Sequence, residues 1–150
     1  MELKIIEQDE DKAKDAFDSA DCQLLLEMYE GFYPQIGFHP PWVGYFVVRG
    51  GRIVGSCGVV GQPQDGRVEV AYWTFKEFEG LGVASFACKE LTSIAYRTDP
   101  SLTVTAKTAP EKNASTSILE KNGFAVEGIV QDHEIGDAWL WVHQKETGVF

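Results

Sequence analysis

The 150 residues of this chain are 44% hydrophobic and 24% charged, a composition typical of a globular domain and not of a disordered chain. Its 13 Lys and Arg against 23 Asp and Glu give a formal net charge of −10, which argues against nucleic acid or an anionic membrane as a partner. No apolar run approaches the roughly 20 residues that cross a bilayer.

Two features of the chain bear on its compartment. The N-terminus, Met1-Glu2-Leu3-Lys4, has neither the basic head nor the apolar core of a signal peptide. Cys22, Cys57 and Cys88 are odd in number and widely spaced, so we expect three buried thiols and no disulfide framework or metal site. Both features fit a reducing cytoplasm.

The chain begins with a predicted strand and a predicted helix. Residues 3–7 alternate between polar and apolar side chains, which indicates a short strand. One of Asp18, Ser19 and Asp21 is expected to cap the helix that follows. The apolar positions of this helix are Leu24, Leu25 and Met28, and Phe17 extends the same face backwards. One long helix and two short ones both fit this pattern.

The next segment, residues 31–42, holds three prolines, two glycines and four aromatic residues. This composition is typical of neither a helix nor a strand, and it is too apolar for a simple linker. Two interpretations stay open for this segment: a lid over a binding site, or a loop packed on the core.

Residues 44–75 predict a three-stranded antiparallel meander. Strands at 44–49 and 52–60 flank Gly50-Gly51, and two glycines supply the positive φ angles that a two-residue hairpin turn needs. A turn at 62–66 leads to the third strand at 67–75.

A short loop with two glycines joins this third strand to a helix. Residues 75–85 read Phe-Lys-Glu-Phe-Glu-Gly-Leu-Gly-Val-Ala-Ser, and the apolar positions from 83 to 96 recur at helical spacing. Gly80 and Gly82 let the backbone approach a ligand closely, and the first N–H groups of the helix have no partner inside it. This layout favours a phosphate, and a plain turn is the alternative.

The C-terminal part predicts a parallel strand pair and a closing hairpin. Residues 102–108 form a β-branched strand, which the preceding helix places parallel to the strand at 67–75. A helix at 113–122 ends at Gly123, and strands at 125–134 and 138–144 follow. We therefore expect an α/β fold in a single domain over residues 1–150, with a mixed, mostly antiparallel sheet flanked by helices.

Two separated motifs carry a family resemblance. Residues 79–84, Glu-Gly-Leu-Gly-Val-Ala, are similar to a loop of the form Gln/Arg-x-x-Gly-x-Gly/Ala, with Glu79 in place of Gln or Arg. Residues 109–124, Ala-Pro-Glu-Lys-Asn-Ala-Ser-Thr-Ser-Ile-Leu-Glu-Lys-Asn-Gly-Phe, resemble the signature Pro-Glu-x-Asn-x-Ser … Leu-Glu-Lys-x-Gly-Phe. Together they resemble the GNAT superfamily of acyl-CoA-dependent N-acyltransferases, and most closely the subgroup that acetylates ribosomal-protein N-termini.

The resemblance implies acetyl-CoA as the cosubstrate and assigns residues to it. The backbone positions implied for its pyrophosphate are Gly80, Leu81, Gly82, Val83, Ala84 and Ser85. The strand end implied to pair with its pantetheine amides is Trp73, Thr74 and Phe75. The helix dipole favours the phosphate charge, whereas the carboxylate of Glu79 should repel it unless that side chain points to solvent.

Acetyl transfer to an amine needs the amine neutral, because an alkylamine with a pKa near 10.4 is almost wholly protonated at neutral pH. Glu69 is the candidate base, and by strand alternation it shares a face with Trp73; an ordinary surface carboxylate is the alternative. Asn113 and Ser115 are the candidates for the thioester end, with helix capping as a further or alternative role. Leu119 stands where many relatives have a tyrosine acid, so the general acid stays open.

The expected function is N-acetylation of a primary amine on a small molecule or a protein N-terminus, and the acceptor is not identified. A catalytically weak acyl-CoA-binding sensor or scaffold of the same fold is the alternative. The expected partners include no nucleic acid, membrane or metal, and a homodimer is left open. The acidic surface is compatible with an amine-bearing partner or with solubility alone.

The remaining aromatic residues and histidines have weaker interpretations. Four aromatic residues of the proline-rich segment could wall the acceptor pocket: Phe32, Tyr33, Phe38 and Trp42. Three histidines fit no metal spacing and no catalytic triad: His39, His133 and His143. Trp139 and Trp141 share one face of the last strand and are expected to pack in the core.

Overall fold

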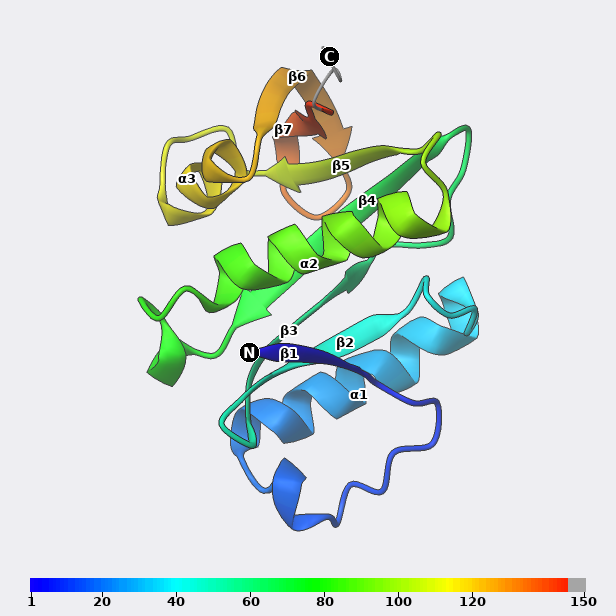
Figure 1. Ribbon diagram of the computed structural model, residues 1–150, viewed down its shortest axis with the longest axis vertical. Coiled ribbons are helices and arrows are strands. Elements are labelled where there is room, and N and C mark those ends of the chain that lie inside the picture. Colours follow the sequence, from blue (N-terminus) through cyan, green and yellow to red (C-terminus); the bar gives the residue numbers. More distant parts are fainter. Residues whose placement is uncertain (146–150) are drawn as a thin grey trace.

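Residues 1–145, which the computed structural model describes, form a seven-stranded mixed sheet with helices on both faces (Figure 1). Across the sheet the strand order is β1-β2-β3-β4-β5-β7-β6; β4 and β5 are parallel, and the other neighbours are antiparallel. The strands are β1 (Glu2–Ile5), β2 (Gly44–Arg49), β3 (Arg52–Val59), β4 (Arg67–Thr74), β5 (Thr103–Thr108), β6 (Phe124–Asp132) and β7 (Gly136–His143). The helices are α1 (Ala20–Ile36), α2 (Val83–Thr98) and α3 (Ala114–Lys121), with two 3₁₀ turns, η1 (Asp15–Phe17) and η2 (Lys76–Phe78). This confirms the predicted α/β class.

The N-terminal helix region consists of a 3₁₀ turn followed by one long helix. Ser19 is the capping residue of α1, and its Oγ accepts the N–H of Cys22 at 3.1 Å. Phe17 lies in η1, where it is buried and stacks on Phe46 with ring centroids 5.3 Å apart. The apolar face that the sequence extended backwards from the helix is therefore continued by a separate turn.

The prediction that residues 31–42 avoid helical structure is wrong for the first half of that segment. Helix α1 continues through Gly31 and Pro34 to Ile36, although proline removes a helical hydrogen bond. Tyr33 explains the outcome, because its hydroxyl donates to the carbonyl of Ile6 at 2.6 Å and accepts the N–H of Gly44 at 3.1 Å. These two buried bonds hold the last turn of α1 against the sheet and outweigh the local propensity.

The second half of the segment supports the interpretation as a packed loop, because Phe38 and Trp42 pack against the core. In the helical half, Tyr33 is buried. Phe32 is 43% exposed on α1 and contacts Tyr29 edge to face, with ring centroids 5.5 Å apart. Most of the aromatic side chains in this stretch therefore belong to the core.

The predicted meander is present. Gly50 and Gly51 have φ angles of 57° and 79°, as the two-residue hairpin between β2 and β3 requires. Asp65 and Gly66, with φ angles of 53° and 74°, form the turn before β4. Element ends differ from the predicted ranges by one or two residues, which is within the ordinary fraying of strand and helix ends.

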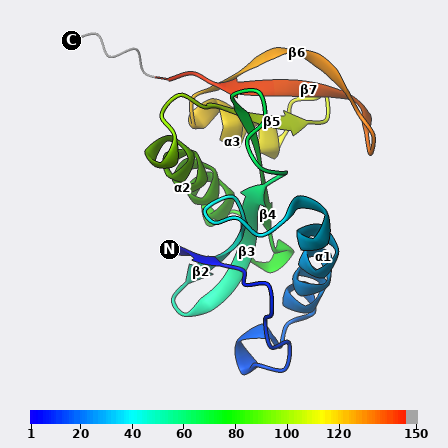
Figure 2. The ribbon, with the colours of Figure 1, turned by 90° about the vertical axis from the view of Figure 1, so that its right-hand side faces the viewer.

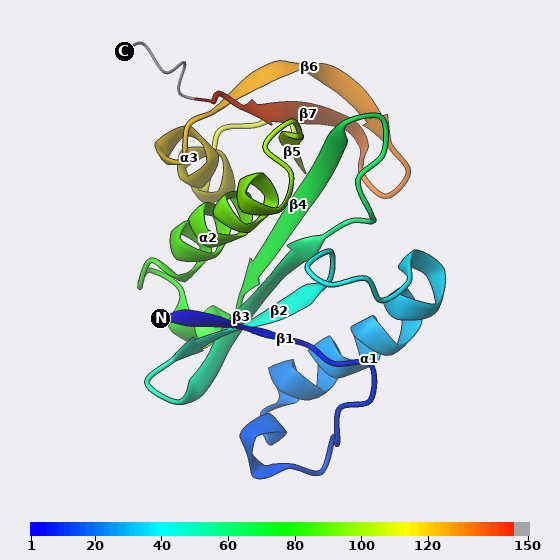
Figure 3. The same cartoon turned by 45° about the vertical axis from the view of Figure 1, so that its right-hand side comes forward.

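The parallel β4–α2–β5 unit is also present. The order of the last two strands in the sheet differs from their order along the chain. They form the expected hairpin, but β7 lies between β5 and β6, so β6 is the edge strand. Figure 3 shows β6 and β7 beyond β5 at one end of the sheet, with β1 and β2 at the other. Trp141 of β7 is buried, and its Nε1 donates to Oγ1 of Thr108 at 2.9 Å, while Trp139 packs against the same core.

Helices α1 and α2 lie on opposite faces of the sheet (Figure 2). The α1 face is built around a close approach, since a Cβ at Gly44 would overlap the ring of Tyr29. A Cβ at Gly58 would lie 2.7 Å from the Tyr29 hydroxyl oxygen. Gly44 and Gly58 are paired across β2 and β3, so these two glycines together make room for the Tyr29 ring beneath α1.

The three cysteines are buried and unpaired, as expected. Burial raises the pKa of the Cys88 thiol to about 12 and raises the pKa of the Cys57 thiol further. Such thiols are inert at neutral pH, because the thiolate is the reactive form.

The contact between Tyr29 and Gly44 predicts that one added methyl group at position 44 destabilises the fold. Gly44→Ala should lower the free energy of unfolding by about 1–3 kcal/mol, because the new Cβ overlaps a packed ring. Gly31→Ala is the matched control: a Cβ at this helical position would meet nothing within 4 Å, so the change should stabilise by about 0.5–1 kcal/mol. Urea unfolding measures both. Equal stability of wild type and Gly44→Ala would contradict the packing described, and Tyr29→Ala in the Gly44→Ala background should relieve the overlap.

Candidate functional site

Strands β4 and β5 pair only over their first residues and then diverge. Their parallel pairing covers Arg67–Glu69 and Thr103–Thr105, whereas β4 runs on to Thr74 paired with β3 alone. Figure 1 shows the two strands side by side near their starts and separated at their ends. The C-terminal half of β4 therefore has one edge without a strand partner among residues 1–145.

The direction of the peptide groups follows from the β3–β4 ladder. Val60 N–H donates to the Glu69 carbonyl, and Phe75 N–H donates to the Val54 carbonyl. Because bonding direction alternates along an antiparallel pair, Glu69, Ala71 and Trp73 turn their peptide groups toward β3. Tyr72 and Thr74 turn theirs toward the gap between β4 and β5.

This geometry refines the positions that the sequence assigned to the strand end. Trp73 pairs with Ser56, so its own N–H and C=O face β3. Its indole packs edge to face on the buried Phe75, with ring centroids 4.9 Å apart. Thr74, which the sequence named, and Tyr72, which it did not, present the open peptide groups.

The N-terminus of α2 lies at the end of this strand and loop. Gly80 and Gly82 have φ angles of 82° and 79°, and a Cβ at either would meet nothing within 4 Å. The first helical bond runs from Phe86 N–H to the Gly82 carbonyl at 3.0 Å. The three N–H groups before it, those of Val83, Ala84 and Ser85, therefore have no acceptor inside the helix.

The N-termini of α1 and α3 are capped by side chains, whereas that of α2 is capped by none in residues 1–145. Ser19 caps α1 and Asn113 caps α3 with their side chains. No side chain of the described residues caps α2, and its first turn carries no acidic residue. The positive end of the α2 dipole is thus open to solvent beside two glycines, which is the arrangement that binds anions.

The remaining loop residues fit around this end. Val83 is buried against the core, and Leu81 is 44% exposed. Ser85 uses its Oγ to accept Nδ2–H of Asn122 at 3.2 Å, which ties α2 to the end of α3. Glu79 is exposed to solvent, so its carboxylate has room to turn away from the helix end.

Helix α3 packs beside α2, close to the open edge of β4. Tyr72 donates its hydroxyl to the Ser115 carbonyl at 3.3 Å and lies 3.5 Å from Ser115 Oγ. Burial raises the pKa of Tyr72 to about 12, so its hydroxyl stays protonated at neutral pH. Tyr72 was not predicted as a site residue, because as an apolar-face tyrosine in a strand it resembles ordinary packing.

Asn113 has the capping role that the sequence left open. Its Oδ1 accepts Thr116 N–H at 3.2 Å, and its own N–H donates to Thr116 Oγ1 at 2.9 Å. Its Nδ2 contacts Glu111 Oε1 at 3.4 Å. Leu119, in the place of the tyrosine acid of many relatives, is fully buried in the core.

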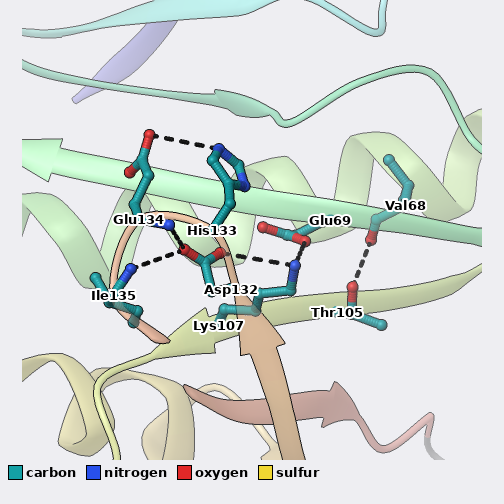
Figure 4. Close-up of polar contacts among 8 residues, drawn as sticks. All are labelled: Val68, Glu69, Thr105, Lys107, Asp132, His133, Glu134 and Ile135. Atoms are coloured by element: carbon teal, nitrogen blue, oxygen red, sulfur yellow. Dashed lines mark hydrogen bonds and ion pairs between the residues drawn. The ribbon is translucent and has the colours of Figure 1, made fainter. Parts of the chain in front are cut away.

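Glu69 lies on the α1 face, opposite α2. It pairs in register with Thr105, and Lys107 of β5 places Nζ 3.3 Å from its Oε1 (Figure 4). Lys107 is also 3.8 Å from Oδ2 of Asp132 at the end of β6. Alternation places Trp73 on this same face, as predicted. The gap between β4 and β5 thus lies between the uncapped helix end on one face and a cluster of charged side chains on the other.

Two hollows on the surface of residues 1–145 bear on the predicted site. One of about 400 Å³ is lined by Glu69, Thr105 and Lys107 among others. The other, of about 460 Å³, lies between α1 and the loop before it, with Glu7, Glu30 and Tyr33 in its lining, and it does not reach the β4–β5 gap. Of the predicted catalytic and cofactor-binding residues, Glu69 alone lines the first hollow, and none lines the second.

The histidines lie at the surface or at the core edge. His143 accepts or donates a 2.7 Å hydrogen bond with the Tyr96 hydroxyl through Nδ1, and burial lowers its pKa. His39 and His133 are exposed. In the described part of the chain, no group of three or more His, Cys, Asp or Glu is arranged to hold a metal. None of the helices in residues 1–145 is both long and apolar enough to cross a membrane.

The chain is similar to known acetyltransferases. The family model of the acetyltransferase (GNAT) domain matches residues 4–125. YdaF of Bacillus subtilis (strain 168), provisionally named a ribosomal N-acetyltransferase, is 33% identical over 66 residues, which are 44% of this chain and 36% of that protein. The N-acetyltransferase p20 of Bacillus licheniformis, whose name calls it uncharacterized, is 30% identical over 85 residues, 55% of this chain and 47% of that protein. The chain thus matches about half or less of the length of these curated relatives.

A solved structure shows the same fold. The ribosomal alpha-N-protein acetyltransferase RimL in complex with coenzyme A superposes with a TM-score of 0.64 at 18% identity, over 81% of this chain and 72% of that one.

The Tyr72 environment predicts a pH dependence of stability. The folded-state pKa of about 12 exceeds the unfolded value of about 10, so the folded state keeps a proton that the unfolded state loses. The resulting contribution is fully present below pH ~10 and falls as the pH rises toward ~12. Tyr72→Phe should reduce the loss of stability per pH unit in that window, as measured by urea unfolding at several pH values. An unchanged slope would show that Tyr72 titrates alike in both states.

Proposed function

This chain belongs to the GNAT acetyltransferase family, and we propose that it transfers the acetyl group of acetyl-CoA to a primary amine on a small molecule or a protein N-terminus. The observation that carries the proposal is the uncapped N-terminus of α2 directly after the unpaired edge of β4. One feature suits a pyrophosphate and the other suits an extended chain with amide groups. Coenzyme A has both parts joined in that order.

The pyrophosphate contacts are backbone groups. The open N–H groups of Val83, Ala84 and Ser85 point along the α2 axis, and the glycines at 80 and 82 leave room for phosphate oxygens. Leu81 lies between the two glycines in this loop. These local dipoles act against the net charge of −10 of the whole chain.

The pantetheine contacts are also backbone groups. Thr74 and Tyr72 present N–H and C=O groups toward the β4–β5 gap, where an extended amide chain can pair with them as an added strand. Trp73 and Phe75 support this edge through the edge-to-face contact of their rings. The thioester would then lie deeper in the gap, toward the point where β4 and β5 meet.

An acceptor that arrives as an ammonium gives up two protons, one to become a nucleophile and one as the C–N bond forms, and the departing sulfur takes up one. Glu69 accepts the first proton and passes it to solvent, and it accepts the second as the C–N bond forms and the C–S bond breaks. Ser115 is the candidate donor to the departing thiolate, and Tyr72, held against it and protonated, can position or resupply it. Asn113 supports Ser115 indirectly by fixing the start of α3.

For the acceptor, we propose only that its reacting group is a primary amine. YdaF and RimL carry the names of ribosomal acetyltransferases, which favours a protein N-terminus over a small amine. The matched segments cover only 36% and 47% of the two curated relatives. The substrate named for a relative is therefore used only as support for this proposal. The cytoplasmic location and the single domain over residues 1–150 stay predictions.

A sensor or scaffold that binds acyl-CoA without turnover is the second candidate. Two observations favour it: Leu119 is buried where many relatives have an acid, and Lys107 is paired with the proposed base. Thiol release from acetyl-CoA over a broad amine panel separates the two candidates. Acceptor-dependent release supports the enzyme, and tight binding of coenzyme A without release supports the sensor.

Binding of coenzyme A is expected to depend on the charge at position 82. Gly82→Asp should weaken binding at least about tenfold relative to Gly82→Asn, since an added anion close to a pyrophosphate costs more than about 1.4 kcal/mol at a protein surface. Asn and Asp both tolerate the left-handed backbone, so the pair differs in charge alone. Isothermal titration calorimetry measures the affinities. Equal affinities of the two variants for coenzyme A would show that the loop does not bind the pyrophosphate.

Glu69→Gln should lower kcat about 10²-fold or more, the usual contribution of a general base, and leave the affinity for coenzyme A within about twofold. Glu79→Gln is the matched control, because Glu79 is an exposed carboxylate in the loop and should affect affinity but not the chemical step. Initial rates with the best amine of the panel give both values. A rate and pH profile of Glu69→Gln equal to those of the wild type would exclude Glu69 as the base.

A further inference from the structure

A lysine stands beside the proposed base on the α1 face. Lys107 Nζ lies 3.3 Å from Oε1 of Glu69 and 3.8 Å from Oδ2 of Asp132, between the two carboxylates (Figure 4). The exposed fractions of the Lys107, Glu69 and Asp132 side chains are 30%, 25% and 18%, respectively. Glu69 and Lys107 also line the hollow of about 400 Å³ on this face. The sequence gives no sign of this cluster, because its members come from three different strands.

Asp132 is held in place by the turn between β6 and β7. Its Oδ1 accepts the N–H groups of Glu134 at 2.8 Å and Ile135 at 3.2 Å. These bonds, that of Glu134 first, hold the pKa of Asp132 below its ordinary value, so it stays an anion. Its Oδ2 faces Lys107, which gives the lysine ammonium a second carboxylate within reach.

The other charged groups around Glu69 are engaged elsewhere. Arg67, on the same strand and lining the same hollow, lies 3.5 Å from Glu127 of β6. His133 and Glu134 in the turn lie 3.9 Å from each other and are 90% and 79% exposed. Among the described residues, Lys107 is therefore the cation that is paired with Glu69.

The lysine carries the same chemical group as the expected acceptor. A primary amine arrives mostly as an ammonium at neutral pH and has to approach Glu69 to give up its proton. Two ammonium groups held about 4 Å apart at one carboxylate repel each other. One of the two must move, and Lys107 has Asp132 to move to.

We propose, on the premise of the acetyl transfer above, that Lys107 holds the acceptor-amine position at Glu69 until an acceptor displaces it toward Asp132. Lys107 is then an internal competitor that selects for acceptors able to displace it. Asp132 lowers the cost of that displacement by keeping the lysine charge paired. The acceptor amine accordingly binds on the α1 face, beside Lys107.

The kinetic test uses two variants with opposite expected effects. With alanylglycinamide as the amine, Lys107→Met should lower KM at least about threefold, the size of a partly exposed ion pair, because the competitor is gone. Asp132→Asn should raise KM by a similar factor, because the displaced lysine loses its second partner. Lys107→Arg retains the charge and should stay near the wild-type KM. In all three, kcat should change less than KM, and the affinity for coenzyme A should stay the same.

A purely structural salt bridge gives a different pattern. If the salt bridge is purely structural, Lys107→Met and Asp132→Asn should change KM in the same direction, because each removes the same contact between the strands. That outcome, or an unchanged KM in Lys107→Met, overturns the proposal.

A binding experiment keeps the inference separate from the proposed turnover. Addition of alanylglycinamide to the wild type should shift the amide resonances of Glu134 and Ile135 in a saturable manner, because their N–H groups bond the carboxylate that receives Lys107. N-acetyl-alanylglycinamide lacks the cation and should not shift them, and Lys107→Met should not show the shift with either peptide. A shift without turnover would refute the acetyl transfer alone. The absence of a shift in the wild type, with or without turnover, would refute the displacement of Lys107.

Discussion

The early separation of β4 from β5 is the constraint on which the rest of the site depends. The two strands pair over three residues each, and β4 then continues along β3 alone. Peptide groups that turn toward such a gap need partners, since an unpaired buried N–H or C=O is costly. The gap therefore suits an extended ligand with amides of its own. The loop at residues 75–82 then leads from the end of β4 to the start of α2, so the open strand edge and the uncapped helix end follow each other along the chain.

The proposed use of an anionic cosubstrate by an acidic chain rests on local fields on the two faces of the sheet. The helix end on the α2 face has open N–H groups and lacks acidic residues in its first turn, so its local field is positive. On the α1 face, Glu69 and Asp132 form a local field that suits an ammonium, and Lys107 lies between them. The net charge of −10 acts at long range, whereas both sites act at contact distance, where the nearest dipoles and charges prevail.

Most elements of the fold could be predicted because their signals are local. The glycine pair at 50 and 51 specified the hairpin, and Asn113 specified the start of α3, in each case through the backbone angles or caps that those residues favour. The extent of α1 was missed because Tyr33 is held by Ile6 and Gly44, which are distant in the sequence. Tyr72 and Lys107 were missed as site residues for the same reason, since each acquires its role only from a partner on another element.

The sequence by itself determined most of the elements and the family, and it indicated a loop for the proposed cosubstrate, because glycines, caps and periodicity act within a few residues of the chain. Only the tertiary structure decided which peptide groups of β4 stay open, that β7 lies between β5 and β6, and that Lys107 stands between Glu69 and Asp132. Those features depend on strand register and strand order. Both are settled by the packing of segments far apart in the chain, which leaves no local pattern to read.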